Sequence, residues 1–162
     1  MIETTSKTPE QFNLFNPAFC GLILASTIAA FSKQTEKGFP YSLSFLVLPT
    51  VLHEDMRKSV PRGGRTTMHA WMQSHGHLKI GFPERCTDLI DVTSNAISFL
   101  TMREIISIYE GNMIINSVVT KPKEVKFSEE MLDIVKCADI LGKLFAGSGS
   151  TGTTYSIFGV KP

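Results

Sequence analysis

The residues of this chain that could take part in catalysis or cofactor binding are few and scattered. A run of glycine, serine and threonine at 147–152 fits the G-x-G-x-x-G pattern of dinucleotide-binding loops. Such a loop binds a pyrophosphate only between a strand and a following helix. Here a helical pattern precedes the loop, and too few residues follow Gly152 for a βαβ unit. We therefore expect a helix C-cap and a flexible loop at this position, and no cofactor.

Histidines offer a second possible chemistry, because His75 and His77 are separated by one glycine and His69 lies shortly upstream. Zinc normally takes three or four ligands, and the nearest acidic or thiol candidates, Glu84 and Cys86, follow a Gly-Phe-Pro break. We expect a polar helix end or loop, and no metal site. No spacing of serine, cysteine, histidine and acid selects a catalytic triad.

The three cysteines, Cys20, Cys86 and Cys137, are far apart and lack the C-x-x-C spacing of zinc or redox sites. Their apolar or helical surroundings predict buried thiols in a reducing cytosol. Paired carboxylates are explained as solvated helix faces or first-turn charges. These pairs are Glu54 with Asp55, Asp88 with Asp91, and Glu129 with Glu130.

A local cluster of positive charge is the strongest candidate for a binding site. It consists of Arg57, Lys58, Arg62 and Arg65, and we call these four residues the basic corner. Two glycines at 63–64 free the backbone to approach an anionic surface. Three interpretations stay open, namely a solvated turn whose arginines cap helix ends, a contact to a phosphate backbone, and docking to an acidic protein surface.

Composition and charge restrict the number of domains, the partners and the cellular location that we expect. The chain has 162 residues, 43% of them apolar, which is enough for one independently folded domain over 1–162. Sixteen Lys and Arg balance 15 Asp and Glu, so no global field points to nucleic acid or membrane. The longest uncharged apolar run, 19–31, is shorter than the roughly 20 residues of a membrane-spanning helix. With no secretion signal recognisable at the N-terminus, we expect a cytoplasmic protein.

Apolar spacing predicts a mostly helical fold. Asn16 can cap a helix that begins at Pro17 and ends near Gly38. A buried helix is expected at 41–52, kinked or restarted at Pro49. Two further helices are expected, one from residue 65 or 66 to Gly76, with Met68, Trp71 and Met72 on one face, and one over 84–102.

A β-hairpin is predicted after these helices, because apolar residues at 106–108 and 113–115 flank Glu110-Gly111-Asn112, where glycine and asparagine supply positive φ. A hairpin after a three-helix run is the layout of a winged helix, so we expect a winged-helix-like core over 10–120. A charged connector, 121–127, should lead to a last helix capped by Ser128 and ending at Ala146. Its apolar stripe is expected to contain Leu132, Val135, Ile140, Leu144 and Phe145.

The C-terminal tail after this helix is apolar enough to pack on the domain or on a partner. Core packing is the preferred interpretation, because a short loop would return the chain to the helix face that ends in Leu144 and Phe145. The candidate docking residues are Tyr155, Ile157, Phe158 and Val160.

Three stretches together carry a resemblance to a known family: FNPAF at 15–19, the apolar and basic run at 39–71, and the ending LGKLFAGSGS...IFGVKP at 141–162. They resemble the small middle subunit of three-component ABC-ATPase defence systems of the Lamassu type. That resemblance implies a winged-helix fold and a subunit without catalytic residues. It also implies two partners, an SMC-like ABC ATPase that senses aberrant or foreign DNA and an effector, often a nuclease, which the middle subunit bridges.

Two function classes therefore compete. The first is a non-enzymatic adaptor that meets DNA only through its complex, with no cofactor and no membrane contact. The second is a free-standing winged-helix regulator that inserts a helix into the major groove. The near-neutral charge and the apolar tail favour the adaptor, because a DNA-binding domain usually has a basic excess.

Overall fold

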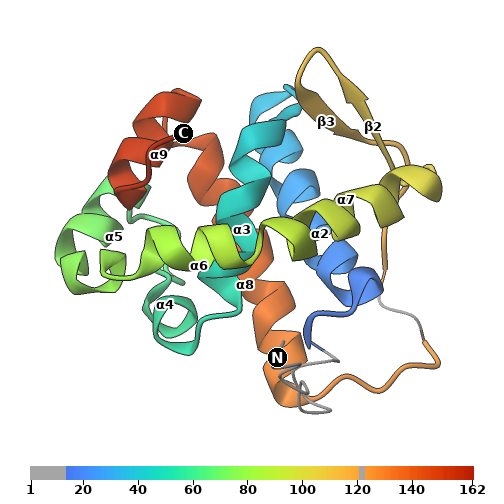
Figure 1. Cartoon of the computed structure of the whole chain (residues 1–162), viewed down its shortest axis with the longest axis horizontal. Helices are drawn as coiled ribbons and strands as arrows, with labels where there is room; N and C mark the ends of the chain where they lie inside the picture. Colours follow the sequence, from blue (N-terminus) through green and yellow to red (C-terminus); the bar gives the residue numbers. More distant parts are fainter. Residues whose placement is uncertain (1–13, 121–122) are drawn as a thin grey trace, which may run out of the picture.

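The long helix α2 (Pro17–Thr35) runs through the middle of the fold (Figure 1), and its start follows from the sequence. The computed structural model describes residues 14–120 and 123–162. In it, Asn16 Oδ1 accepts a hydrogen bond from the Ala18 N–H at 2.8 Å, and proline occupies the first helical position. Both features are as predicted. The helix ends earlier than predicted, because Glu36 rather than Gly38 adopts the left-handed cap conformation (φ 55°).

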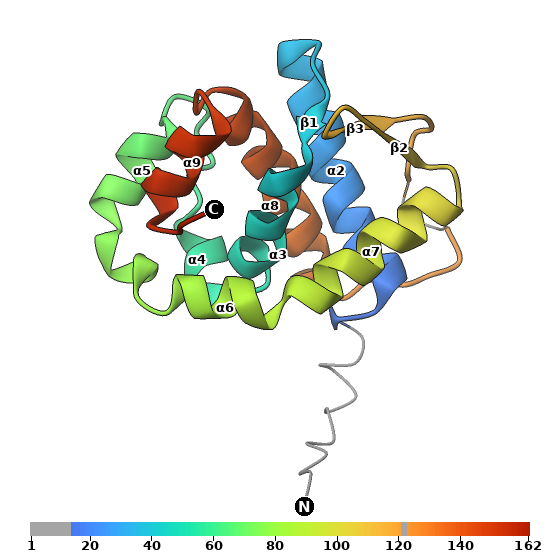
Figure 2. The same ribbon diagram turned by 45° about the horizontal axis from the view of Figure 1, so that its top comes forward.

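The elements that follow α2 in chain order are β1 (Phe39–Pro40), the 3-10 helix η1 (Tyr41–Leu43), α3 (Ser44–Val51), α4 (Glu54–Ser59), α5 (Met68–Ser74), the 3-10 helix η2 (Gly76–Lys79), α6 (Phe82–Asp88), α7 (Ile90–Met102), β2 (Ile106–Tyr109), β3 (Asn112–Ile115), α8 (Glu129–Ala146) and α9 (Thr151–Phe158). Among these elements, helices α3, α7 and α8 lie beside α2, whereas α5 and α9 lie on the far side of α3 (Figures 1 and 2). The predicted fold class, mostly helical with a small β-hairpin, is confirmed. None of the helices in the described ranges is both long and apolar enough to span a membrane.

Helices α3 and α5 agree with the apolar pattern. Helix α3 is buried along its length and continues through Pro49 without a fresh start. Met68, Trp71 and Met72 form the buried face of α5, as the spacing predicts. Helix α5 begins at Met68, two or three residues later than expected, because the Thr67 hydroxyl caps it and accepts a hydrogen bond from the Ala70 N–H at 3.2 Å.

The predicted helix over 84–102 is wrong in one respect, since it is two helices. Helix α6 begins at Phe82 after Gly81, whose φ of 74° lies in the left-handed region. The backbone departs from helical geometry at Leu89, and α7 continues roughly in line with α6 (Figure 2). The hairpin therefore follows a longer series of helices, α2 to α7, than the expected run of three.

The hairpin of β2 and β3 is confirmed, with Tyr109 paired to Asn112 across a two-residue turn. The turn consists of Glu110 (φ 49°) and Gly111 (φ 74°), so asparagine belongs to the strand and not to the turn as predicted. A third strand, β1, was not foreseen and pairs antiparallel with β3 in the order β1–β3–β2. Two residues are too short to show a strand periodicity, which explains the omission.

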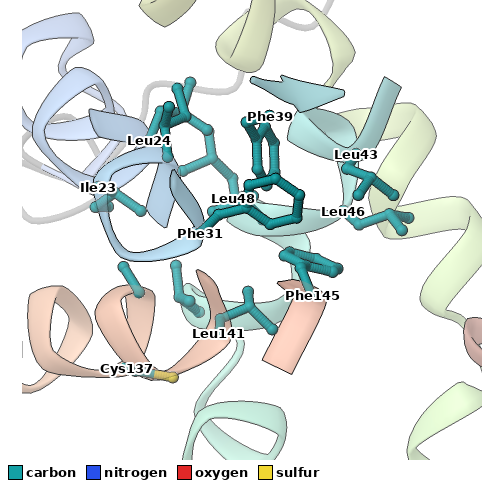
Figure 3. Packing of buried hydrophobic residues seen from close by; sticks show 14 of the residues in the cluster. Ile23, Leu24, Phe31, Phe39, Leu43, Leu46, Leu48, Cys137, Leu141 and Phe145 are labelled. Carbon is teal, nitrogen blue, oxygen red and sulfur yellow. The ribbon is translucent and has the colours of Figure 1, made fainter. Parts of the chain in front are cut away.

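The core lies where α2, α3 and α8 meet the inner face of the small sheet. Phe39 of β1 is fully buried, with its ring centroid 5.1 Å from that of Phe31 and 5.8 Å from that of Phe145. Figure 3 shows Phe39 within this cluster of buried residues, together with Phe31, Phe145 and Leu141. The sheet is therefore anchored to the helices through β1.

Helix α8 begins as predicted, since the Ser128 hydroxyl accepts a hydrogen bond from the Met131 N–H at 3.2 Å, but its predicted stripe is wrong. Of the five expected residues only Phe145 is fully buried. The residues that face the core are Ile134, Cys137, Ala138, Leu141, Gly142 and Phe145. Helix α2 therefore covers a face that is rotated from the one with the larger side chains.

The first testable prediction concerns Gly142, where α8 approaches α2 closely. A Cβ at this position would lie 2.3 Å from the Thr27 carbonyl oxygen, which is backbone and cannot move aside cheaply. Overpacking of this kind costs up to about 3 kcal/mol, whereas alanine gains about 1 kcal/mol of helix propensity over glycine. We expect Gly142→Ala to lower the free energy of unfolding by about 2 kcal/mol in urea titrations.

Gly147 provides the matched control, because it lies just beyond the same helix and an added Cβ would come no closer than 3.8 Å to another atom. Gly147→Ala should leave the stability within about 0.5 kcal/mol of the parent. Equal stability of Gly142→Ala and the parent would contradict the close approach of α2 and α8.

Candidate functional site

The four residues of the basic corner do not form one surface. Arg57 and Lys58 belong to α4, whereas Arg62 and Arg65 lie in the loop between α4 and α5.

Helix α4 is capped by His53, whose Nδ1 accepts a hydrogen bond from the Met56 N–H at 3.3 Å. The pKa of this histidine is lowered, first by burial and then by the positive charge of Arg85.

Arg57 is buried, with 4% of its surface exposed, and its guanidinium contacts three other residues of the protein. Its Nη1 donates to the Val51 carbonyl at 2.8 Å, at the end of α3. Its Nη2 contacts the Glu130 carboxylate at 3.1 Å, and its Nε contacts the Asp133 carboxylate at 3.2 Å. The guanidinium thus joins α3, α4 and α8, and it presents no free face to a partner.

The other three cations are more exposed. Arg62 forms an ion pair with the second carboxylate oxygen of Asp133 at 3.0 Å, so one aspartate holds two arginines. Lys58 pairs with Glu54 one helical turn away. Within the described part of the chain, Arg65 is exposed and has no carboxylate within 4 Å. The predicted role in phosphate or partner contact therefore stays open for Arg65 above all.

A cleft of about 440 Å³ lies beside Arg65, between the loop and α8. Arg62, Arg65 and Lys143 line it together with the hydroxyls of Thr66 and Thr67. Lys143 and Arg62 each have an acidic partner, Lys143 through Asp139 at 2.8 Å. This arrangement can hold an acidic side chain against Arg65, but it does not give a continuous track of phosphate-binding cations.

The C-terminal tail forms a helix that begins inside the stretch predicted to be a flexible loop, so the loop is shorter than expected. The Ser150 hydroxyl accepts a hydrogen bond from the Thr153 N–H at 3.2 Å and starts α9. The G-x-G-x-x-G match thus spans the end of one helix and the start of the next, and no strand precedes it. The capping serine occupies the helix start to which a pyrophosphate would bind.

Two of the four candidate docking residues of the tail lie in the core. Phe158 is fully buried, and the Tyr155 hydroxyl donates to the Ser42 carbonyl at 2.5 Å. Burial raises the pKa of Tyr155. Ile157 and Val160 are only half-buried and remain accessible at the surface. Tyr155 and Phe158 therefore fix the tail, and the other two can still meet a partner.

Two largely apolar grooves flank the helical core. One of about 670 Å³ lies between α3, α6 and the tail, with Phe45, Ile90 and Val160 in its wall. The other, of about 570 Å³, lies at the start of α2 and contains Phe99 and the cation of Arg103 above that ring at 4.4 Å. Both are suited to apolar side chains of another molecule.

The cysteines and His75 are held within the fold by burial and by a backbone contact. Burial raises the pKa of all three cysteine thiols to about 12, so none is a thiolate at neutral pH. They are free and buried, as predicted. His75 is bound through Nδ1 to the Trp71 carbonyl at 2.8 Å, and its ring lies 6.2 Å from that of His77. Among the described residues, no three histidine, cysteine or acidic side chains come together as metal ligands.

Comparison with protein families shows the family to which this chain belongs. The family model for Middle Component 3 of the ABC-three component (ABC-3C) systems matches residues 4–162. The chain belongs to this family. The predicted resemblance to a middle component of a three-component ABC-ATPase system is thereby confirmed, and the match includes the basic corner, both grooves and the tail of this middle component. No curated protein and no solved structure matches the chain.

Sequence reasoning missed the contacts that join distant parts of this middle component. Glu130 and Asp133 are three residues apart on α8, a spacing that places both carboxylates on one helix face. That spacing could have suggested a shared cation. It could not show that the cation is Arg57, which lies more than 70 residues away in the sequence.

Proposed function

We propose that this middle component is a non-catalytic adaptor, which bridges an SMC-like ABC ATPase that senses DNA to an effector nuclease and regulates that effector. The observation that carries the proposal is the family match along almost the whole chain. Raised thiol pKa values and a histidine engaged by backbone give no support to a reaction centre. The cytoplasm and a Lamassu-type defence complex are part of the same proposal.

Surface chemistry supports an adaptor with two contact regions. The apolar grooves lie on different elements, one beside the tail and one beside the start of α2. The cleft at Arg65 adds a positive site for an acidic group of a partner. Separate regions of this kind suit a subunit that touches two neighbours at once.

The winged-helix layout, which we keep as part of the proposal, is supported by the strand order. Strand β1 follows α2, and the hairpin after α7 pairs with it through β3. In such a layout α7 and the hairpin would face DNA. Helix α7 contains Asp91 but no lysine or arginine, and Glu110 lies at the hairpin tip. A free-standing DNA-binding regulator is therefore the weaker alternative.

The adaptor function is tested by co-expression with the ABC ATPase and the effector of the same three-component system. We expect one complex of three components, and loss of the association between ATPase and effector when this subunit is omitted. The isolated subunit should neither hydrolyse ATP nor cut DNA in the presence of Mg²⁺ or Mn²⁺. Unchanged association without this subunit, or metal-dependent cleavage abolished by changing His75 and His77, would refute the adaptor.

DNA titration distinguishes the alternative. If the basic corner contacted phosphates, the affinity of the isolated subunit for duplex DNA would fall with salt with a slope of about −0.9 per phosphate contacted. We expect weak binding or none. Tight and steeply salt-dependent binding that is lost in Arg65→Ala would favour the regulator.

A further inference from the structure

Strand β2 leaves one edge of the small sheet free. In the order β1–β3–β2, β3 has a neighbour on each side, whereas β2 has only β3 among the described residues. Figure 1 shows β2 at the outer side of the hairpin, away from the helices that carry β1. Ser107, Ile108 and Tyr109 of this strand are all exposed. A row of backbone donors and acceptors therefore faces solvent.

The register shows which backbone groups these are. Tyr109 and Asn112 flank a two-residue turn, so they form a hydrogen-bonded pair, and such pairs alternate along an antiparallel ladder. Ile108 and Met113 are therefore a non-hydrogen-bonded pair. This agrees with the pairing of Met113 to Phe39 of β1, on the side of β3 that faces away from β2. The N–H and C=O of Ile108 consequently point outward from the free edge.

This edge strand is short, with four residues, but it lacks other features that usually prevent strand pairing. Its register with β3 runs without a bulge, and the strand sequence ISIY contains no lysine and no proline. Ile108 is 46% exposed and Tyr109 is 65% exposed, so β-branched and aromatic surface accompanies the free backbone. An open groove of about 540 Å³, with Thr101, Ile106 and Asn116 in its wall, runs beside the strand.

The charges at the two ends of β2 indicate which kind of strand could pair with its free edge. Glu104 precedes the strand and Glu110 follows it, and both are exposed and have no cation within 4 Å in the described part of the chain. In the antiparallel register that would pair Ile106 with Ile108 of a second copy, the end of β2 with Glu104 would lie beside the end with Glu110 of the other copy. The negative charges brought together at both ends would repel each other. A strand with basic ends would instead be attracted.

We infer that β2 is a docking site for an extended segment of a partner protein, with apolar residues at alternate positions and basic residues at both ends. The segment adds a fourth strand to the sheet at β2. Backbone hydrogen bonds to Ile108 hold it, and Glu104 and Glu110 select its charged ends. This site is separate from the grooves and the cleft that support the adaptor proposal, and it can be tested without the other two components.

The test is fluorescence anisotropy with the purified subunit and a short labelled peptide that alternates valine and threonine and has arginine at both ends. We expect binding to the parent subunit, and weaker binding by about tenfold in Ile108→Pro, which removes the outward N–H without removing a hairpin hydrogen bond. A peptide with glutamate at both ends should bind at least about tenfold more weakly than the arginine peptide.

Ile114→Lys is the matched control for Ile108→Lys, a second variant that avoids a backbone change. Ile114 belongs to β3 and is 42% exposed, close to the 46% of Ile108, but it pairs with Ser107 inside the sheet and does not lie on the free edge. We expect the edge variant to weaken peptide binding more than the control does, with both variants melting as the parent does. Lysine on the edge strand is a change that natural edges tolerate.

Three results would overturn the inference. The first is absence of binding of the arginine peptide to the parent subunit, and the second is equal binding to the parent and Ile108→Pro. The third is a dimer of the parent subunit in sedimentation that Ile108→Pro converts to a monomer, because β2 would then pair with a second copy. A monomeric parent with peptide binding that depends on Ile108 supports it.

Discussion

Phe158→Ala is expected to lower the free energy of unfolding by about 3–5 kcal/mol, the usual cost of removing a fully buried phenylalanine. The ring lies 5.1 Å from that of Phe82, 6.0 Å from that of Trp71 and 6.3 Å from that of Phe145, measured between centroids. These partners belong to α6, α5 and α8. Phe158 thus connects three helices, and its loss leaves a cavity that none of them can fill alone.

Urea titration and thermal melting measure this effect, with a fall in Tm of about 10 °C expected for a domain of this size. Ser156→Ala is the control, because Ser156 lies on the same helix and is exposed. Truncation after Gly147 removes Tyr155 as well and should destabilise the subunit further. A truncated subunit that melts like the parent but no longer joins its partners would instead assign the whole tail to partner docking.

Arg57→Ala is expected to lower the free energy of unfolding by about 2–3 kcal/mol. Removing one member of a buried ion pair costs about 3–5 kcal/mol, but Glu130 and Asp133 are 56% and 41% exposed at their side chains and regain water when the arginine is lost. The Val51 carbonyl loses its donor, and α4 loses its connection to α8. The effect should appear in stability and not in partner affinity.

Arg65→Ala and Lys58→Ala are the matched controls, because both residues are exposed and their loss should change stability by less than about 0.5 kcal/mol. Urea titration and co-purification of all three variants distinguish an effect on stability from an effect on complex formation. If Arg57→Ala left stability unchanged but reduced complex formation, Arg57 would instead be assigned a role in partner contact. Arg65→Ala is the variant in which a specific loss of complex formation is expected.

Local chemistry determined the starts of α2 and α8 and the presence of the hairpin. Asn16 before Pro17, and Ser128 before two glutamates, each satisfy free N–H groups of the first turn from side chains that are neighbours in sequence. The hairpin likewise depends on two adjacent residues, since Glu110 and Gly111 form its turn with positive φ values, although asparagine was predicted in place of Glu110. Features of this kind need no partner from elsewhere in the chain, so the sequence by itself was sufficient to predict them.

Tertiary contacts decided which side of each helix is buried and which charges are free. Leu132 and Ile140 form an apolar stripe on α8 in the sequence, but α2 packs instead on the face with Ala138 and Gly142, because small residues let two backbones approach closely. The basic corner is a cluster in sequence only, since carboxylates on α8 take up Arg57 and Arg62 and leave Arg65 exposed. Close packing and ion pairing depend on distances between residues far apart in the chain, and only the fold fixes those distances.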